Sequence, residues 1–436
     1  MFARLVPIAC AVLVTTGCEK TNHENLDKWM HTEQGPGKLK KALADESLDP
    51  DLSAHAATNM IKTGHDIDVR AELDQMPGPR RTAVVGKLAP RLWEMARIEG
   101  DMTLPGPNQI IGKDGLLAIR KYADDATRQQ IDTYLIDWYG VASYEGRAGV
   151  GAVNGPAVMR MLGEPAAKKL ISVANGVIAA PGQEKEKNRV GDELLTGLGA
   201  TCSPDAVKYV LDVAKMTSRG DATLPKRALD ALYRAYVDPG GLFDICAPAP
   251  LVPHLDDLVS IAKDEKMPPE AANDAVALIR VVGAPKCIAP LVSMIAMPYP
   301  DPRFKYVAAS GALRCGGAAA IKDVVRALPD GPYDREDLDG AVAGEIAKLT
   351  PRAQVLAALR ELLEDKRPLT AWTAAEALAD MKSVEDAPKL AALKSNARLV
   401  GYWGDQSGVD PKQRKDEPTL AQRAKELADR LGKPGK

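Results

Sequence analysis

The residues of this chain that could do chemistry are few and scattered. It has five histidines among 436 residues, and no two have the i, i+4 spacing with which a helix offers two imidazoles to one metal ion. No phosphate-binding loop, Gly-x-Ser-x-Gly turn or Cys-x-x-Cys pair occurs, and Gly149-Val150-Gly151 lacks the preceding strand that a dinucleotide-binding loop needs. We therefore predict no catalytic residue, no cofactor and no metal site, and a protein that is not an enzyme.

Two isolated groups have simpler explanations than a site. His55 lies among alanines on an expected helix, where packing accounts for it. Asp66 and Asp68 begin another expected helix, where carboxylates complement the positive helix end. Neither group predicts catalysis or metal binding.

The N-terminus carries a targeting signal. Residues 1–4 include one arginine, and an apolar run of about a dozen residues extends from Leu5 to Gly17. Such a run is too short to span a bilayer comfortably but fits a signal peptide. It ends at Cys18, directly after a small residue.

The stretch Thr15-Thr16-Gly17-Cys18 resembles a bacterial lipobox, although Thr15 stands where Leu is usual. The resemblance implies cleavage before Cys18, which is then lipidated on its sulfur and its amine. Each buried methylene of the acyl chains contributes about 0.8 kcal/mol to membrane binding. Because Glu19 rather than Asp follows the cysteine, the resemblance implies an outer-membrane anchor facing the periplasm. The alternative is an ordinary secretory signal with an incidental cysteine.

The composition favours an all-helical protein. Apolar residues make up 45% of the chain but aromatic residues only 4%, and Ala and Leu supply most of the apolar surface. Small apolar side chains permit close helix packing. The formal net charge of −2 gives no bias toward nucleic acid, so we predict no nucleic-acid partner.

Repeated helix ends organise most of the sequence. After a polar stretch over residues 18–34, which we interpret as a flexible tether, helix–turn–helix patterns begin at Gly35. A period in the low-to-middle thirties is typical of stacked helical hairpins. The expected turns between repeats lie near Asp124, Gly163, Gly199, Ala247, Gly283, Gly316, Thr350 and Lys382.

The stretch from Leu39 to Gly64 resembles a HEAT repeat: a helix, an Asp-Pro-Asp turn, an Ala-rich helix and a glycine. The signature of tetratricopeptide repeats, which share the period, is missing. We therefore predict an all-α fold, an α-solenoid of HEAT-like antiparallel hairpins over residues 35–436. Its N-terminal repeats are irregular, and Thr419–Leu431 is expected to be a capping helix.

The hairpins predict how four cysteines pair. An even number of cysteines in an exported chain indicates disulfides, and four allow three pairings. Cys287 begins the first helix of a hairpin and Cys315 ends the second, so their ends are neighbours. Cys202 and Cys246 occupy the equivalent places. We predict Cys202–Cys246 and Cys287–Cys315; the alternative is four buried free thiols.

Basic residues recur near the ends of the second helices. There they complement the helix dipole and bond the last carbonyls, or they form one edge of a groove that holds an acidic partner or glycan. This basic ladder comprises Arg160, Arg234, Arg280, Arg314 and Lys348.

Three insertions, residues 141–156, 181–188 and 400–418, interrupt the repeats. Loops of such length are commonly functional or disordered. The expected aromatic anchors in or beside them are Trp138, Tyr139, Tyr402 and Trp403.

We predict a non-enzymatic, lipid-anchored scaffold of the cell envelope that binds a protein partner along the concave face of a solenoid. The alternatives are a carbohydrate- or peptidoglycan-binding lipoprotein, and a subunit of an envelope assembly or motility complex.

Overall fold

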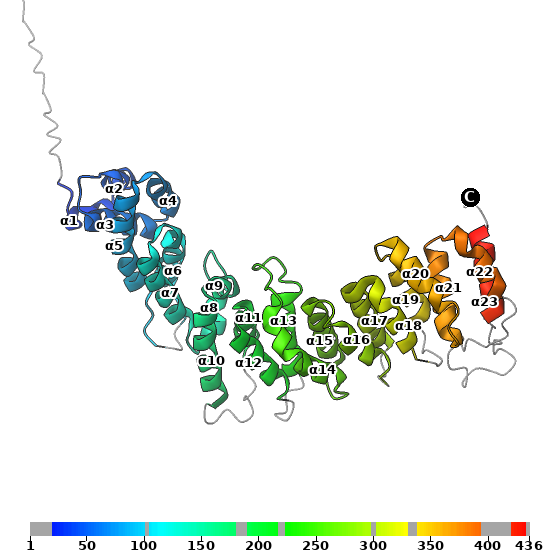
Figure 1. Cartoon of the computed structure of the whole chain (residues 1–436). Helices are drawn as coiled ribbons and strands as arrows, with labels where there is room; N and C mark the ends of the chain where they lie inside the picture. The colour runs from blue at the N-terminus through cyan, green and yellow to red at the C-terminus, as the bar shows by residue number, and fades with distance from the viewer. Residues whose placement is uncertain are drawn as a thin grey trace, which may run out of the picture. The chain divides into compact units, whose positions relative to one another are not determined.

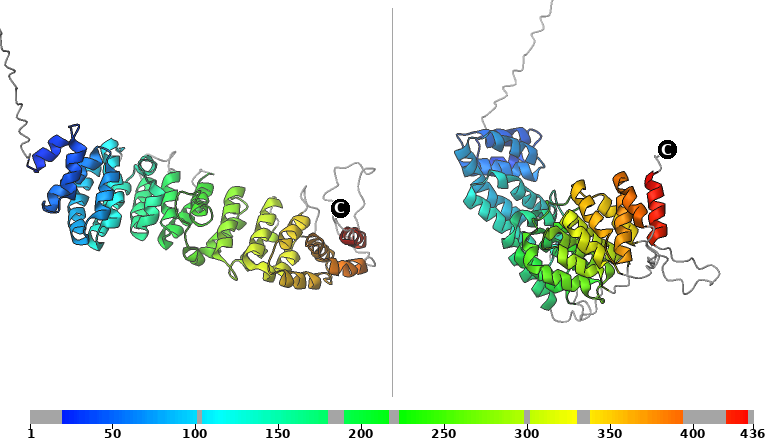
Figure 2. Two further views of the ribbon diagram at one scale, coloured as in Figure 1. Left: turned by 90° about the horizontal axis from the view of Figure 1, so that it is seen from above. Right: turned by 45° about the vertical axis from the view of Figure 1, so that its right-hand side comes forward.

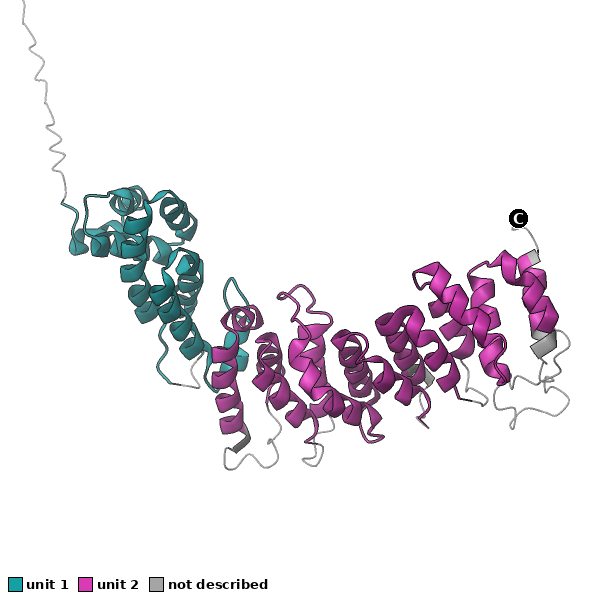
Figure 3. Cartoon of the chain, viewed as in Figure 1, with its two compact units in different colours: residues 1–154 teal, residues 155–436 magenta. Residues whose placement is uncertain are grey.

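The computed structural model is all-α over the residues that it describes. These are residues 20–100, 104–179, 190–216, 223–297, 302–329, 338–393 and 420–432. The chain divides into two compact units, residues 1–154 and 155–436 (Figure 3). The predicted all-α architecture of sequential helix pairs is confirmed, and the division at residue 154 falls within the predicted insertion 141–156.

Unit 1 has two helix layers. Helices α3, α5 and α7 follow one another in one layer, and α2, α4 and α6 form the other (Figure 1). Its elements are α1 (His23–Trp29), α2 (Gly35–Ala44), α3 (Pro50–Lys62), α4 (Asp66–Gln75), α5 (Gly78–Ala96), α6 (Pro107–Ile119), the 3-10 helix η1 (Arg120–Tyr122), α7 (Asp125–Tyr139) and α8 (Tyr144–Ala148).

The predicted tether is wrong for residues 23–29, which form α1 against α2 and α3. Leu26 and Trp29, three residues apart and therefore on one helix face, are buried. On α3, His55 contacts His23 with a 2.8 Å Nδ1···Nδ1 distance and lies 2.8 Å from the Asp27 carboxylate. Burial, more than any neighbouring charge, lowers the pKa of His55. Its role in the fold is thus to hold α1 in place.

Two of the predicted aromatic anchors are also wrong. Trp138 and Tyr139 are buried in unit 1, because α7 continues through both of them. The Trp138 indole donates a 3.1 Å hydrogen bond to the Ala96 carbonyl of α5. Tyr139 packs between Trp138 and Tyr144 of α8, a helix within the stretch predicted as an insertion. These aromatic rings are core and offer no surface for a partner.

Unit 2 is likewise built of sequential helices. Its elements are α9 (Gly155–Leu162), α10 (Glu164–Ala179), α11 (Asp192–Ala200), α12 (Pro204–Ala214), α13 (Leu224–Tyr236), η3 (Ala249–His254), α14 (Leu255–Lys263), α15 (Pro269–Val282), α16 (Ile288–Ile295), α17 (Pro302–Gly316), η4 (Gly317–Ala320), α18 (Ile321–Ala327), α19 (Leu338–Ala347), α20 (Arg352–Leu362), α21 (Pro368–Asp380), η5 (Val384–Asp386), α22 (Ala387–Ala392) and α23 (Leu420–Gly432). Helix α23 occupies the stretch where a capping helix was expected.

The odd-numbered helices of unit 2, from α9 to α21, stack in chain order into one layer, which we call the odd layer (Figure 2). Neighbouring helices approach more closely in the odd layer than in the even-numbered layer. At the α11–α13 contact, a Cβ on Gly199 would lie 2.7 Å from the Ala231 carbonyl oxygen, so only glycine fits there. Close packing of small residues therefore sets the spacing of this layer.

Prolines and capping side chains place the helix starts. Proline occupies one of the first two positions of α3, α12, α15 and α21. The first N–H groups of a helix have no acceptor within it, so the N–H that proline lacks is not needed there. The Asp49 and Asp124 carboxylates accept 2.8 Å bonds from backbone N–H groups of α3 and α7. At the end of α15, Gly283 has φ +85°, a conformation that favours glycine.

Both predicted disulfides are present. Cys287 precedes α16 and bonds Cys315 at the end of α17, with their Cα atoms 6.5 Å apart. Cys202 precedes α12 and bonds Cys246, beyond α13, with a Cα–Cα distance of 5.6 Å. The pairing follows the antiparallel hairpins as predicted.

Several predictions fall on residues outside the described ranges: the lipidated Cys18, the insertions 181–188 and 400–418, and the anchors Tyr402 and Trp403. None of the described helices is both long and apolar enough to cross a membrane.

Candidate functional site

The segment after α13 forms a compact loop, residues 237–248, that returns to the odd layer. It opens with a tight turn in which the Leu242 N–H donates to the Pro239 carbonyl at 3.0 Å. Gly240 and Gly241 have φ +59° and +78°, so this turn needs its two glycines. The Asp238 carboxylate accepts the Gly240 N–H at 3.0 Å. We call residues 237–248 the stapled loop, because a disulfide closes it.

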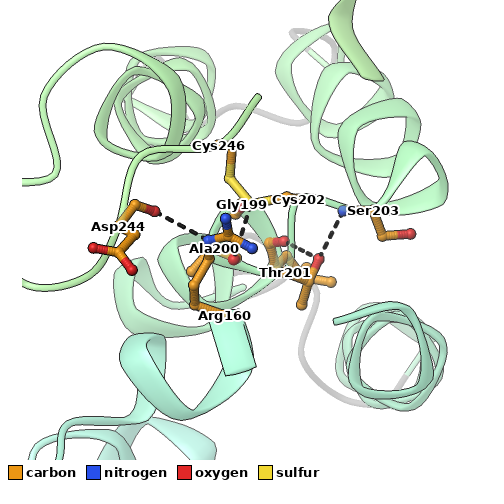
Figure 4. The surroundings of a disulfide bond; sticks show 9 residues. Arg160, Gly199, Ala200, Thr201, Cys202, Ser203, Asp244 and Cys246 are labelled. Atoms are coloured by element: carbon orange, nitrogen blue, oxygen red, sulfur yellow. Dashed lines mark hydrogen bonds between the residues drawn. A yellow bond between two sulfur atoms is a disulfide. The ribbon is translucent and has the colours of Figure 1, made fainter. Parts of the chain in front are cut away.

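The Cys202–Cys246 disulfide ties the far end of the stapled loop to the end of α11 (Figure 4). The Cys246 N–H also donates to the Ala235 carbonyl at 2.8 Å, and Cys246 is 2% exposed. Cys202 itself has φ +54°, which ends α11 and turns its side chain toward the loop. Covalent and hydrogen bonds thus fix the same point.

A second attachment comes from α9. The Arg160 Nε donates a 3.0 Å hydrogen bond to the Asp244 carbonyl oxygen, and Figure 4 shows the guanidinium beside Gly199 and the disulfide. Burial raises the pKa of the Tyr236 hydroxyl, and the positive charge of the nearby Arg160 partly opposes that rise. The stapled loop therefore reaches from α13 past α11 to α9.

The stapled loop presents apolar side chains to solvent. Leu242 is 40% exposed and Ile245 is 50% exposed, while Cys246 beside them is buried. A loop that only joined two helices would be more stable with these side chains buried. Full burial of each side chain would contribute roughly 1.5–3 kcal/mol. Because Leu242 and Ile245 lie on one loop whose backbone is fixed by covalent and hydrogen bonds, they form a candidate contact surface.

The basic ladder lies on the odd layer, as its regular spacing predicts, but it is largely engaged within the chain. Arg160 bonds Asp244, and Arg234 bonds the Asp230 carboxylate at 2.9 Å. Arg314 and Lys348 share the Glu345 carboxylate at 3.2 and 2.8 Å. Both cations lower the pKa of the Glu345 carboxyl, and Lys348 lowers it more than Arg314 does.

Arg280, in the last turn of α15, is half-buried, and its guanidinium has no hydrogen-bond or ion-pair partner among the described residues. The structure therefore connects most of the ladder to internal acceptors. An acidic partner of the basic ladder stays a prediction. Of the five ladder residues, only Arg280 could bind such a partner without first breaking a bond within the chain.

Among the described residues, the Asp274 carboxylate of the odd layer has no cation within ion-pair distance. Asp274 of α15 is half-buried, and burial, followed by the charge of Asp230, raises its pKa to about 6, while Lys226 opposes the rise. A carboxyl group in this state is close to half protonated near pH 6.

Sequence reasoning missed the stapled loop. The signal was available in the turn-forming run Asp238-Pro239-Gly240-Gly241 followed by apolar residues and Cys246.

In the described residues, no three His, Cys, Asp or Glu side chains are grouped as a metal ion would require.

Comparison with known proteins identifies no family. No family model matches the chain, and no curated protein matches it. Among solved structures, human deoxyhypusine hydroxylase in complex with glycerol is 13% identical over 70% of this chain and 99% of its own, with a TM-score of 0.24. An engineered protein is 14% identical over 80% of this chain and 96% of its own, with a TM-score of 0.14. Neither likeness carries an argument about function.

Removal of the stapling disulfide should loosen the loop. The double substitution Cys202→Ala with Cys246→Ala opens a loop of 44 residues in sequence, for which a chain-entropy estimate gives a loss of about 4 kcal/mol in the free energy of unfolding. Limited proteolysis should then cut within residues 237–248. The matched control, Cys287→Ala with Cys315→Ala, should lose similar stability without that cleavage. Unchanged cleavage in the first variant would show that the disulfide does not hold the loop.

Asp274 should make the folded state more stable when it is protonated. Its folded pKa of about 6 lies above the ordinary value of 3.8, so its contribution is lost as pH rises through about 4 to 6. Asp274→Asn should therefore raise the thermal midpoint at pH 8 and leave it nearly unchanged at pH 4. Equal effects of Asp274→Asn at both pH values would contradict the raised pKa.

Proposed function

We propose that this chain is a non-enzymatic, lipid-anchored binding platform of the cell envelope that holds a protein partner against the odd layer of unit 2. The observation that carries the proposal is the stapled loop, which exposes Leu242 and Ile245 from a backbone fixed by a disulfide and by Arg160. Apolar anchors on a rigid support lose little conformational freedom when a partner binds them.

The two disulfides support an exported location. Such bonds persist in oxidising compartments and are rare in the cytosol. They agree with the apolar N-terminal run and the lipobox-like Thr15–Cys18, from which we propose an outer-membrane anchor facing the periplasm. The carbohydrate-binding alternative is weakened, because Trp138 and Tyr139 are buried rather than displayed.

Partner capture should depend on the stapled loop. Leu242→Asn with Ile245→Asn removes both apolar contacts without adding charge, so the partner should be depleted at least tenfold in quantitative pull-downs from crosslinked cells. Val384→Asn is the matched control, since Val384 is also an exposed apolar residue of unit 2, at 64% exposure, but lies far along the chain. Non-reducing electrophoresis should show both disulfides intact in each variant. If both variants retained the same partners as the unsubstituted chain, the loop would not be the binding surface.

The lipid anchor has a separate test. In bacterial cells fed an alkyne-labelled fatty acid, the unsubstituted chain should become labelled, and Cys18→Ser should abolish the label because it removes the acylated sulfur. Cys10→Ser, within the apolar run, should keep it. Label on the Cys18→Ser protein, or none on the unsubstituted chain, would favour the ordinary secretory signal instead.

A further inference from the structure

Unit 1 contains a cavity of about 380 Å³ between α3, α4, α6 and residues 152–153, separate from the surface discussed above. Apolar side chains form much of its lining, including Ile61, Ile111 and Leu117. Glycine and alanine at several other lining positions leave the space open. The volume is within the range of small-ligand sites, about 300–1,000 Å³. Figure 1 shows the three helices beside one another.

A buried lysine lies behind one wall of this cavity, next to the lining residue Asp114. Lys113 of α6 is fully buried, and its ammonium donates to the Val150 carbonyl at 2.9 Å and lies 2.6 Å from Asp114 Oδ1. It also stands over the Trp138 ring, 5.5 Å from the centroid. The other Asp114 oxygen accepts the Ala152 N–H at 2.8 Å. Lys113 and Asp114 therefore fix residues 150–152, one bonding Val150 and the other Ala152.

Gly151 shows how closely that wall is fitted. It has φ +94°, and a Cβ there would lie 2.3 Å from the Lys113 ammonium. A buried ion pair is expensive to desolvate and is weak evidence for a gain in stability. Here the pair fixes the position of residues 150–152, beside the lining residues Ala152 and Val153, and a fixed wall is the preorganisation that a binding site requires.

The charges at the cavity cancel. Lys113 pairs with Asp114, and Arg70 pairs with Asp66 at 3.1 Å, where both side chains are partly exposed. The two pairs leave no net charge to attract an ion, and an ion that entered the apolar lining would lose its hydration without gaining a partner. Polar side chains line the cavity at two places: the Asp66–Arg70 pair, which is partly exposed at one side, and the Asp114 carboxylate, which pairs with Lys113.

From this geometry we propose that the cavity binds a small uncharged molecule with an alkyl or acyl body, whose polar head lies at the Asp66–Arg70 pair. The apolar lining takes the body, and the charged pair at the edge can both donate to and accept from a neutral amide or ester. The proposal does not depend on the partner-binding role of unit 2.

Three probes with the same alkyl chain test the charge preference on the purified full-length chain. N-hexylacetamide is neutral, hexanoate is an anion and hexyltrimethylammonium is a cation. Ligand-observed NMR titration should show saturable binding of the neutral probe, at least tenfold tighter than that of either ion. Equal binding of all three, or no saturable binding of the neutral probe, would overturn the proposal.

Variants locate the site. Ala118→Phe fills the cavity from α6 and should weaken binding of N-hexylacetamide at least tenfold, whereas Ala126→Phe, at an exposed position of α7, should leave it unchanged. Ala152→Leu fills the cavity from residues 152–153 instead and serves if Ala118→Phe fails to fold. Tenfold weaker binding in a folded cavity-filling variant supports the site. Unchanged binding in that variant, or an equal loss in Ala126→Phe, contradicts it.

Discussion

The structure of unit 2 depends on one constraint: no helical hairpin can bury both of its faces, so each relies on its neighbours. The odd layer meets that constraint by close approach of small residues, as Gly199 does against the Ala231 carbonyl. Such packing leaves a polar face in which cations and carboxylates pair, as Arg314 and Lys348 do with Glu345. Regular packing therefore accounts for most of what the odd layer displays.

The stapled loop is the feature that regular packing does not account for. It leaves the end of α13, is fixed by Cys246 to the end of α11, and is held by Arg160 of α9. The same arginine that seemed part of a free basic ladder is thus a support for an apolar surface. A binding role in unit 2 then rests on Leu242 and Ile245 rather than on repeated positive charge.

The features predictable from the sequence were the local ones. Proline at helix starts, glycine at helix ends and the hairpin period predicted the helix pairs, and the antiparallel geometry then predicted Cys202–Cys246 and Cys287–Cys315. What failed depends on contacts distant in sequence. Trp138 is buried because its indole meets the Ala96 carbonyl, 42 residues earlier, and Arg160 meets a backbone carbonyl 84 residues later. A backbone acceptor leaves no mark in the side-chain sequence, so no spacing could reveal either contact.

The most direct test is site-specific photocrosslinking in intact cells, with a photoreactive amino acid at Ile245 and, in a parallel strain, at Val384, which is at least as exposed. We expect a discrete crosslinked protein at position 245 that is absent at position 384. We also expect this product to disappear when Cys202 and Cys246 are both replaced by alanine. No product at position 245, or the same product at both positions, would contradict the claim that the stapled loop is the binding surface.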